Sequence, residues 1–232
     1  MKKRFLLVLV LLLAVFLVTG CGKDNKDALE FKKEYESLNG VVNKNGKEHR
    51  TITIDKDNPY VKVTPEKIVE MLDKNETFFL YVGDSLCPWC RSVLEKSIEV
   101  AHDYKIDKIY YIEIWDDEGT EILRDKYELN PILTKTVEGT ESYKTLLEKF
   151  DSVLSEYTLT DTEGHKISVG EKRIYAPNYF YVKNGKVEKM IDGISEKQTD
   201  SREELTPEML KDEETEFKSL FDLANSCDES GC

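Results

Sequence analysis

The stretch FFLYVGDSLCPWC, residues 78–90, places an apolar run directly before two cysteines that lie three positions apart. The run is rich in aromatic and aliphatic residues, which is typical of a short buried strand, and we expect that strand over residues 77–82. The pair Cys87 and Cys90 is compatible with half of a metal site, a structural disulfide or a reactive thiol pair. The surrounding sequence decides among the three.

The residues after the two cysteines predict a helix and then a second strand. Leu94, Ile98 and Ala101 recur at helical spacing, so we expect a helix that begins at the first cysteine and runs to about Tyr104. KIYYIEI, residues 108–114, predicts the next strand. Strand, CxxC, helix and strand form a βαβ unit, and in that context a CxxC pair is typical of a redox motif.

The chain offers a poor ligand set for a metal ion. A structural zinc ion takes four ligands. The other cysteine pair, Cys227 and Cys232, lies far along the chain and has four intervening residues, while His49, His102 and His165 show no ligand spacing. We therefore expect no metal site and no cofactor.

The start of the chain indicates export. Residues 1–4 are basic, and residues 5–18 form an unbroken apolar run of 14 residues. That run is shorter than the about 20 residues that span a bilayer as a helix. LVTGC, residues 17–21, resembles the lipobox of bacterial lipoproteins. The resemblance implies a signal peptide over residues 1–20 and a lipid on Cys21, which would anchor the protein at the extracytoplasmic face of the bacterial cell membrane. An ordinary secretory signal and an uncleaved anchor are the alternatives.

The chain is strongly acidic. It carries 46 acidic and 33 basic residues, a formal charge of −13. Removal of residues 1–20 takes away Lys2, Lys3 and Arg4 and leaves 30 basic residues, so the formal charge becomes −16. Such a surface repels phosphate backbones, and we exclude nucleic acid as a partner. The remaining 212 residues are enough for one substantial core.

Two cysteine pairs remain once Cys21 is set aside for the lipid. An even number of cysteines outside the cytoplasm favours disulfide chemistry. Cys227 and Cys232 lie in a C-terminal tail, residues 227–232, and their spacing permits a local disulfide as a structural clip. The alternative is a second redox couple that passes electrons to Cys87.

Further elements surround the βαβ unit in a domain that we place at residues 49–226. Residues 21–48 combine a polar tether with an N-terminal helix. HRTITI, residues 49–54, alternates like a strand, and TPEKIVEMLD, residues 64–73, opens with Thr-Pro, the usual start of a helix. Residues 205–226 predict a final helix that docks on the sheet.

The segment IYAPNYFYVKNGKVEKMIDG, residues 174–193, predicts a strand from Pro177, a two-residue Asn-Gly turn and a returning strand. With FFLYVGDSLCPWC, this pattern resembles the thioredoxin superfamily, in its strand with redox motif and in its cis-proline strand. The resemblance implies a thioredoxin-like α/β fold, a central mixed sheet flanked by helices. It also implies a cis bond between Ala176 and Pro177 opposite Cys87.

Residues 115–173 are an insertion relative to thioredoxins, and we expect it to be helical. EGTEILRDKYELNP, residues 118–131, predicts one helix. Apolar residues from Tyr143 to Tyr157 recur at helical spacing and predict a second helix, which packs on the main sheet or, alternatively, docks a partner. The next residues predict a hairpin with its turn at residues 161–164.

Within the superfamily, the chain resembles thioredoxin-like lipoproteins of Gram-positive-type bacteria, some described as bacteriocin transport accessory proteins. Cytoplasmic thioredoxins carry Trp directly before the first cysteine and a buried Asp six residues before it. Here these places hold Leu86 and Tyr81, which argues against a general reductase of the thioredoxin type. Pro88 is shared with glutaredoxins and with Dsb-type oxidases, and the latter also carry a helical insertion before the cis-proline.

Position in the predicted helix assigns roles to the two cysteines. A thiolate at a helix N-terminus meets the positive end of the dipole and free N–H groups, which lower its pKa. We therefore expect Cys87 to be the exposed nucleophile. Cys90, one turn into the helix, would be shielded and would resolve the mixed disulfide.

Neighbouring residues complete the predicted site. Trp89 offers an apolar ledge to a substrate, while Ala176 and Pro177 direct backbone toward an extended substrate segment. A packing tryptophan and a simple turn proline are the alternatives. We interpret Asp84 and Arg91 as solvated surface charges; the alternative is that Arg91 stabilises the Cys87 thiolate and Asp84 opposes it.

These features predict an extracytoplasmic, membrane-anchored thiol–disulfide oxidoreductase. Its partners would be thiols and disulfides of secreted or surface proteins and a membrane redox partner. A reduction potential between those of thioredoxin and of Dsb-type oxidases would lean slightly toward oxidation or isomerisation. The alternative is a surface lipoprotein that serves as a binding, assembly or bacteriocin-transport accessory module, with a structural disulfide in CPWC.

Overall fold

The computed structural model describes residues 23–116 and 118–225. Cys21, Cys227 and Cys232 lie outside these residues. The signal peptide, the lipid attachment and the second disulfide therefore stay predictions.

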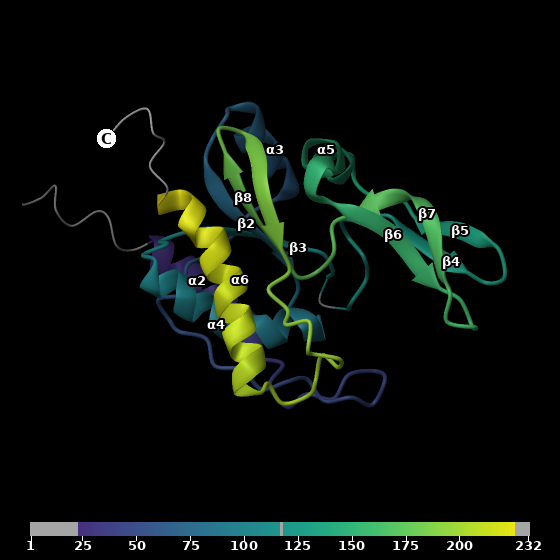
Figure 1. The fold of residues 1–232 in the computed structure, drawn as a ribbon, viewed down its shortest axis with the longest axis horizontal. Coiled ribbons are helices and arrows are strands. Elements are labelled where there is room, and N and C mark those ends of the chain that lie inside the picture. Colours follow the sequence, from purple (N-terminus) through teal and green to yellow (C-terminus); the bar gives the residue numbers. More distant parts are fainter. Residues whose placement is uncertain (1–22, 117, 226–232) are drawn as a thin grey trace, which may run out of the picture.

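The core of the protein is a five-stranded mixed sheet in the order β1-β3-β2-β8-β9 (Figure 1). β1 (Tyr60–Lys62), β3 (Ile109–Glu113) and β2 (Phe78–Gly83) are parallel neighbours. β8 (Asn178–Lys183) pairs antiparallel with β2, and β9 (Lys186–Ile191) pairs antiparallel with β8. The mixed sheet, the crossover from β2 to β3 and the final hairpin agree with the fold that the sequence predicts.

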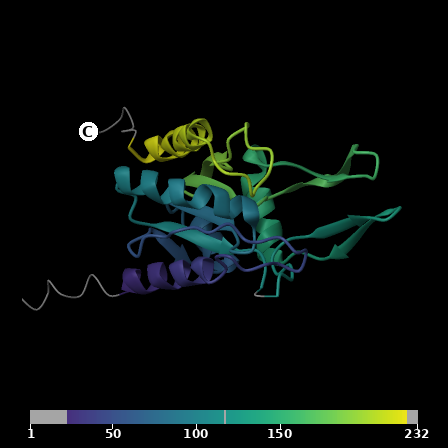
Figure 2. The ribbon, with the colours of Figure 1, turned by 90° about the horizontal axis from the view of Figure 1, so that it is seen from below.

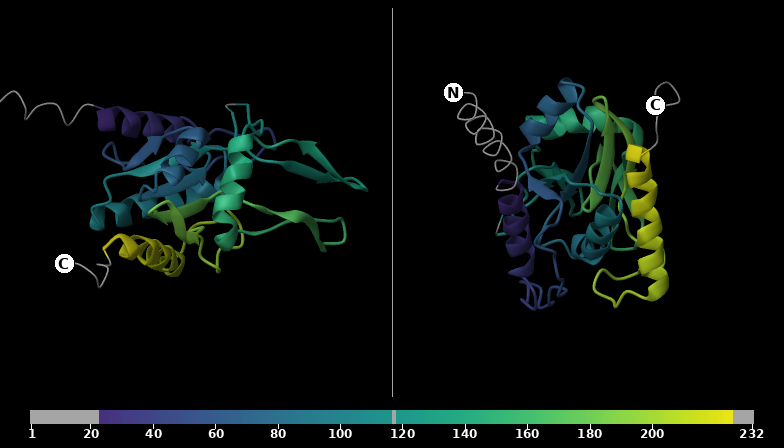
Figure 3. Two further views of the ribbon diagram at one scale, coloured as in Figure 1. Left: turned by 90° about the horizontal axis from the view of Figure 1, so that it is seen from above. Right: turned by 90° about the vertical axis from the view of Figure 1, so that its left-hand side faces the viewer.

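Helices cover both faces of the sheet. α2 (Lys23–Glu36), α4 (Pro88–Asp103) and α6 (Pro207–Asn225) contribute to the core on one face. α3 (Pro65–Asp73) and α5 (Glu141–Phe150) contribute to the core on the other. Figures 2 and 3 show α4 between α2 and α6. The N-terminal helix, the Thr-Pro helix and the final helix of the sequence analysis are all present.

Side-chain alternation along β2 explains why the sheet has a core on each face. Phe79 and Tyr81 point into the core that α4 shares, whereas Phe78, Leu80 and Val82 point into the core under α3 and α5. All five side chains are buried. Because β2 is the central strand, its continuous apolar run reflects burial on both faces.

Residues 49–54 do not form the predicted strand. Ile52 and Ile54 are buried, so the alternation in the sequence predicts correctly which side chains are buried. Their backbone N–H groups donate to side chains instead of to a neighbouring strand: Ile52 to Asn39 Oδ1 at 3.1 Å, and Ile54 to Glu36 Oε1 at 2.8 Å. The sheet instead ends on one side at β1, which is only three residues long.

The insertion differs from the helical segment that the sequence predicts. β4 (Lys126–Leu129) and β5 (Leu133–Val137) form one hairpin, and β6 (Ser155–Thr160) and β7 (Lys166–Arg173) form a second. Figure 2 shows both hairpins extending from the same end of the molecule. The predicted hairpin turn at residues 161–164 is confirmed.

The prediction of a helix over residues 118–131 is wrong, because a nearby side chain accepts hydrogen bonds from the backbone of this segment. Asp116 Oδ1 accepts the N–H groups of Glu118 at 3.0 Å and Thr120 at 2.8 Å. Such short-range capture competes with helical hydrogen bonding. The chain then enters β4 in an extended conformation.

The second predicted helix is shorter than its apolar stripe. Tyr143, Leu146 and Phe150 of α5 are buried against the sheet, as predicted. The helix ends at Phe150 in a 3₁₀ turn, and Tyr157 of the stripe belongs to β6. Leu154 still belongs to the core that α5 covers, whereas Tyr157 packs within the two hairpins.

The turn between β8 and β9 has the geometry that the Asn-Gly pair predicts. Asn184 has φ +50° and Gly185 has φ +72°. A β-carbon on Gly185 would lie 2.4 Å from the carbonyl oxygen of Leu72, at the end of α3. The glycine is therefore required both by its backbone conformation and by the close approach of α3.

We predict that Gly185→Ala lowers the free energy of unfolding by about 2–3 kcal/mol, because strain at positive φ adds to a backbone clash. Gly164→Ala is the matched control, since Gly164 has φ +88° and a β-carbon at that position would meet no atom within 4 Å. It should cost about 1 kcal/mol. Urea unfolding of both variants measures the difference. Equal losses would show that the approach of α3 contributes nothing.

Helix α6 buries an acidic side chain. Glu213 is 0% exposed, and both of its carboxylate oxygens lack a hydrogen-bond partner among the described residues. Burial raises the pKa of Glu213 to about 8. The folded protein therefore holds a proton there between the ordinary pKa, 4.5, and about 8.

Because the folded state binds the additional proton in this window, the contribution of Glu213 to stability falls as the pH rises from about 5 to 8. Glu213→Gln removes that titration, so the variant should gain stability relative to the wild type over the same range, on the order of 3 kcal/mol. Urea midpoints of both proteins across the range measure the difference. A difference that does not change with pH would contradict a protonated Glu213.

Candidate redox site

The first cysteine of CPWC caps helix α4. Cys87 is the N-cap residue, in an extended backbone conformation, and Pro88 occupies the first helical turn. The backbone N–H of Cys90 donates to Cys87 Sγ at 3.4 Å. Both cysteines are free thiols. A sulfur in this position receives the partial positive charge of the helix end.

The Ala176–Pro177 peptide bond is cis, as the resemblance to thioredoxins implies. The Cys87 thiol donates to the carbonyl oxygen of Ala176 at 3.4 Å. Pro177 itself is buried, while Ala176 is half-buried. The loop before β8 therefore faces the first cysteine with backbone polar groups.

The two sulfurs differ in acidity. A hydrogen bond from the Cys90 thiol, together with the N–H groups of Cys90 and Trp89, lowers the pKa of Cys87. Burial raises the pKa of Cys90 well above its ordinary value, and the neighbouring Cys87 raises it further. Cys87 is thus the sulfur that ionises first.

Cys87 is more buried than the sequence suggests. We expected an exposed nucleophile, but its side chain is only 4% exposed and belongs to the core under α4. Trp89, Trp115 and Ala176 are half-buried and pack against the same core. Trp115 comes from the chain just after β3 and was not anticipated, because its distance in sequence gives no sign of this contact.

Arg91 is not a solvated charge. It is 0% exposed, and its guanidinium donates to the carbonyl oxygens of Arg50 at 2.9 and 2.6 Å and of Tyr35 at 2.8 Å. It also donates to the carbonyl oxygen of Ser85 at 3.3 Å and to Asn39 Oδ1 at 2.6 Å. The sequence interpretation was wrong because the segment after α2 folds over the start of α4.

Asp84 is also buried, at 1% exposed, contrary to expectation. Its carboxylate accepts the N–H groups of Leu86 at 2.9 Å and Trp115 at 2.9 Å. Burial raises the pKa of Asp84 to about 7, against the lowering effect of these two hydrogen bonds. When ionised, Asp84 raises the pKa of Cys87.

Tyr81 takes the buried position that the resemblance to thioredoxins assigns to an aspartate. Its ring is fully buried, and its hydroxyl lies 3.0 Å from the hydroxyl of Tyr35. It also hydrogen-bonds the Cys90 side chain, which opposes part of the rise in the pKa of Cys90. Burial raises the pKa of Tyr81 well above its ordinary value, so this hydroxyl keeps its proton.

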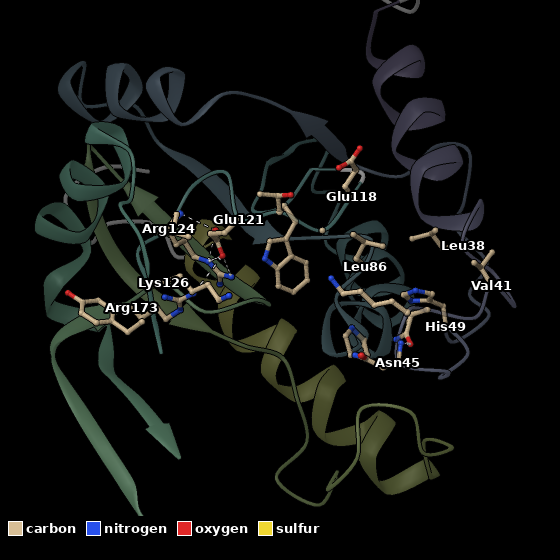
Figure 4. Close-up of a pocket in the computed structure, with 18 of the residues that line it drawn as sticks. Leu38, Val41, Asn45, His49, Leu86, Glu118, Glu121, Arg124, Lys126 and Arg173 are labelled. Atoms are coloured by element: carbon tan, nitrogen blue, oxygen red, sulfur yellow. Dashed lines mark hydrogen bonds and ion pairs between the residues drawn. The ribbon is translucent and has the colours of Figure 1, made fainter. Parts of the chain in front are cut away.

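A cavity of about 950 Å³ lies beside CPWC, and we call it the flanking cavity. Leu86 and Pro88, which precede and follow Cys87, form part of its wall. Figure 4 shows two further groups of lining residues. Arg124 and Arg173 lie with Glu121 on one side, and residues of the segment after α2 lie on the other, with Leu86 between them.

Metal-binding and membrane-spanning features are absent from the described part of the chain. Among residues 23–116 and 118–225, no cluster of three or more His, Cys, Asp or Glu side chains is arranged to hold a metal ion. Within the same ranges, no helix is both long and apolar enough to cross a bilayer.

Comparisons with known proteins leave the family open. No protein-family model and no curated protein matches the chain. Among solved structures, thioredoxin O2 from Arabidopsis thaliana in its oxidized state is similar at 14% identity, over 60% of this chain and 85% of that chain, with a TM-score of 0.31. A likeness at this level adds no argument about activity, so the function must be inferred from the site residues of this chain.

Proposed function

We propose that the protein is a membrane-anchored thiol–disulfide oxidoreductase that acts outside the cytoplasm on secreted or surface proteins. One observation carries the proposal: Cys87 caps α4, with the N–H of Cys90 directed at its sulfur and the Ala176 carbonyl opposite. This arrangement stabilises a thiolate and offers backbone to an incoming chain.

The proposed exchange proceeds in two steps. The Cys87 thiolate attacks one sulfur of a substrate disulfide, so that a mixed disulfide forms and the other substrate sulfur leaves as a thiolate. Cys90 then loses its proton and attacks Cys87 Sγ, which releases the second substrate thiolate and leaves a Cys87–Cys90 disulfide. Run in reverse, the same steps oxidise a substrate dithiol and reduce the Cys87–Cys90 pair.

The site supports an intermediate reduction potential. The hydrogen bonds that lower the pKa of Cys87 come from uncharged donors in Cys90 and Trp89, and the nearby Asp84 opposes them. The guanidinium of Arg91 is directed at backbone carbonyls. Since a strongly stabilised thiolate makes a strong oxidant, a moderately stabilised one favours exchange or mild oxidation.

Location and partners belong to the proposal as well. A lipid on Cys21 would hold the protein at the membrane, where a membrane redox partner would renew the Cys87–Cys90 couple. Substrates would be thiols and disulfides of exported proteins. Cys227 and Cys232 would form a local clip or, alternatively, a relay to Cys87.

The second candidate is a binding or assembly module, as in bacteriocin transport accessory proteins, with a structural disulfide in CPWC. The burial of Cys87, at 4% exposed, favours this alternative because a reactive sulfur must meet its substrate. Free thiols with unequal acidity favour the oxidoreductase.

The two candidates predict different behaviour of cysteine variants. We expect Cys87→Ser to abolish insulin reduction and thiol oxidation by the full-length chain, since the attacking sulfur is lost. Cys90→Ala should retain the attack and accumulate mixed disulfides through Cys87, detected by non-reducing gels and mass spectrometry. Wild-type activity no greater than that of Cys87→Ser, and no mixed disulfide with Cys90→Ala, would support the binding module.

The anchor is tested separately. We expect Cys21→Ala to release the protein from membranes or mislocalise it. After removal of the signal peptide, the lipid would be the only stable attachment of the protein to the membrane. Membrane fractionation and gel mobility measure the outcome. Unchanged fractionation together with unchanged mobility would contradict lipid attachment.

A further inference from the structure

The flanking cavity is built mainly by parts of the chain outside the βαβ unit. Leu38, Val41 and His49 come from the segment that follows α2. Tyr157 comes from β6, and Arg173 from β7. Among the lining residues, only Leu86 and Pro88 come from the CPWC region, so the additions form most of the wall of this cavity (Figure 4).

The lining is cationic although the protein is acidic. Lys44, Arg124, Lys126, Arg173 and Arg202 line the cavity, against two acidic residues, Glu118 and Glu121. The whole chain has a formal charge of −13. Positive charge is therefore concentrated at this recess, where it can select an anionic group locally.

The buried part of this charge is not neutralised within the cavity wall. Glu121 contacts two guanidinium groups, Arg124 at 2.7 Å and Arg173 at 3.7 Å. All three side chains are less than 10% exposed. One carboxylate cannot balance two buried cations, so a net positive charge faces the recess. The nearby Asp125 carboxylate is already paired with Lys135 at 2.9 Å.

The two guanidinium groups are held in place by neutral partners. Arg124 donates to the Ile174 carbonyl oxygen at 3.3 Å, and Arg173 donates to the carbonyl oxygen of Asp125. The guanidinium of Arg173 also lies 4.1 Å from the centre of the Tyr157 ring. These contacts fix the positions of the charges without cancelling them.

An unpartnered polar group on the opposite wall also indicates a ligand. His49 is 4% exposed, and its Nδ1 atom has no hydrogen-bond partner among the described residues. Burial lowers the pKa of His49, assisted by the charges of Arg91 and Arg202, so the imidazole is neutral. A buried ring nitrogen without a partner is costly unless a bound group completes its hydrogen bond.

We propose that the flanking cavity binds the segment of a partner protein around its reactive cysteine, and that it selects segments with an acidic side chain near that cysteine. This inference rests on the proposed function, which requires a substrate sulfur to reach Cys87. The apolar wall, including Leu38 and Leu86, would hold the segment, the excess positive charge near Arg124 and Arg173 would receive the carboxylate, and His49 would bond a backbone group.

The acidic surface restricts the partner further. A uniformly acidic protein would be repelled before it reached the recess. The chemistry fits an exported protein with a neutral or basic surface and a single acidic residue beside its cysteine.

The test uses three synthetic peptides of one sequence, each with a single cysteine disulfide-bonded to thionitrobenzoate. They carry Asp, Asn or Lys two positions from the cysteine. Cys87 attacks the peptide sulfur, so a Cys87–peptide disulfide forms and thionitrobenzoate leaves with the electron pair; Cys90 then displaces the peptide thiolate. The rate at which the reduced full-length chain releases thionitrobenzoate from a peptide, minus the rate for Cys87→Ser, gives the rate of attack by Cys87.

We expect the Asp peptide to react roughly tenfold faster than the Asn peptide, and the Lys peptide to be the slowest. Lys126→Glu, at an exposed position of the lining, should remove most of the preference for Asp. Lys186→Glu is the matched control, since it makes the same charge change at an exposed position of β9 outside the lining, and it should keep the preference. Higher salt should weaken the preference.

A binding measurement separates this inference from the proposed function. Fluorescent peptides with Ser in place of cysteine are titrated with the wild-type chain and with His49→Phe, whose fold is checked by its urea midpoint. Tighter binding of the Asp peptide, weakened roughly fivefold by His49→Phe, supports the inference even if no peptide undergoes exchange. Equal rates and equal affinities for the three peptides would overturn it, while exchange activity itself would leave the proposed function intact.

Discussion

The buried guanidinium of Arg91 holds together the parts of the chain that make the site. It bonds the end of α2 through Tyr35, the following segment through Asn39 and Arg50, and the loop before α4 through Ser85. A rigid planar group with five donors suits this role, because it can satisfy carbonyls from several directions at once. Without it, the wall of the flanking cavity formed by residues 38–49 would lose its fixed position against α4.

The core under α4 contains both sulfurs, and it also contains tyrosine hydroxyls that keep their protons. Tyr60 and Tyr179 have hydroxyls 3.1 Å apart, and Tyr60 also lies 2.6 Å from the Ser97 hydroxyl. Tyr81 bonds Tyr35 and Cys90 in the same core. Hydroxyls can donate and accept hydrogen bonds without adding charge, so they bring polar groups into this core at a lower cost than further buried ions would.

Much of the fold could be predicted from local patterns. Residues 77–82 predicted the strand, the spacing of Leu94, Ile98 and Ala101 predicted the helix capped by Cys87, and the Asn-Gly pair predicted the final hairpin. These patterns work because the strand and the helix depend on neighbours in sequence. The resemblance to thioredoxins supplied the cis bond before Pro177, which is present.

The errors arose where distant segments meet. Residues 49–54 carry the alternation of a strand, but side chains near the end of α2 bind their backbone. Arg91 and Asp84 look like surface charges in the sequence, and only the fold shows which carbonyls and N–H groups surround them. The charge of the flanking cavity was equally hidden, since its cations come from segments far apart along the chain.

The burial of Cys87 limits the rate of thiol–disulfide exchange without changing the reduction potential that sets its equilibrium. A couple of intermediate potential would exchange with most small thiols and disulfides that collide with it. With Cys87 only 4% exposed, such collisions rarely bring a sulfur into line with it. Under the proposed function, a chain that first binds in the flanking cavity would stay long enough for exchange, so the protein would be kinetically insulated from the small-molecule thiol pool around it.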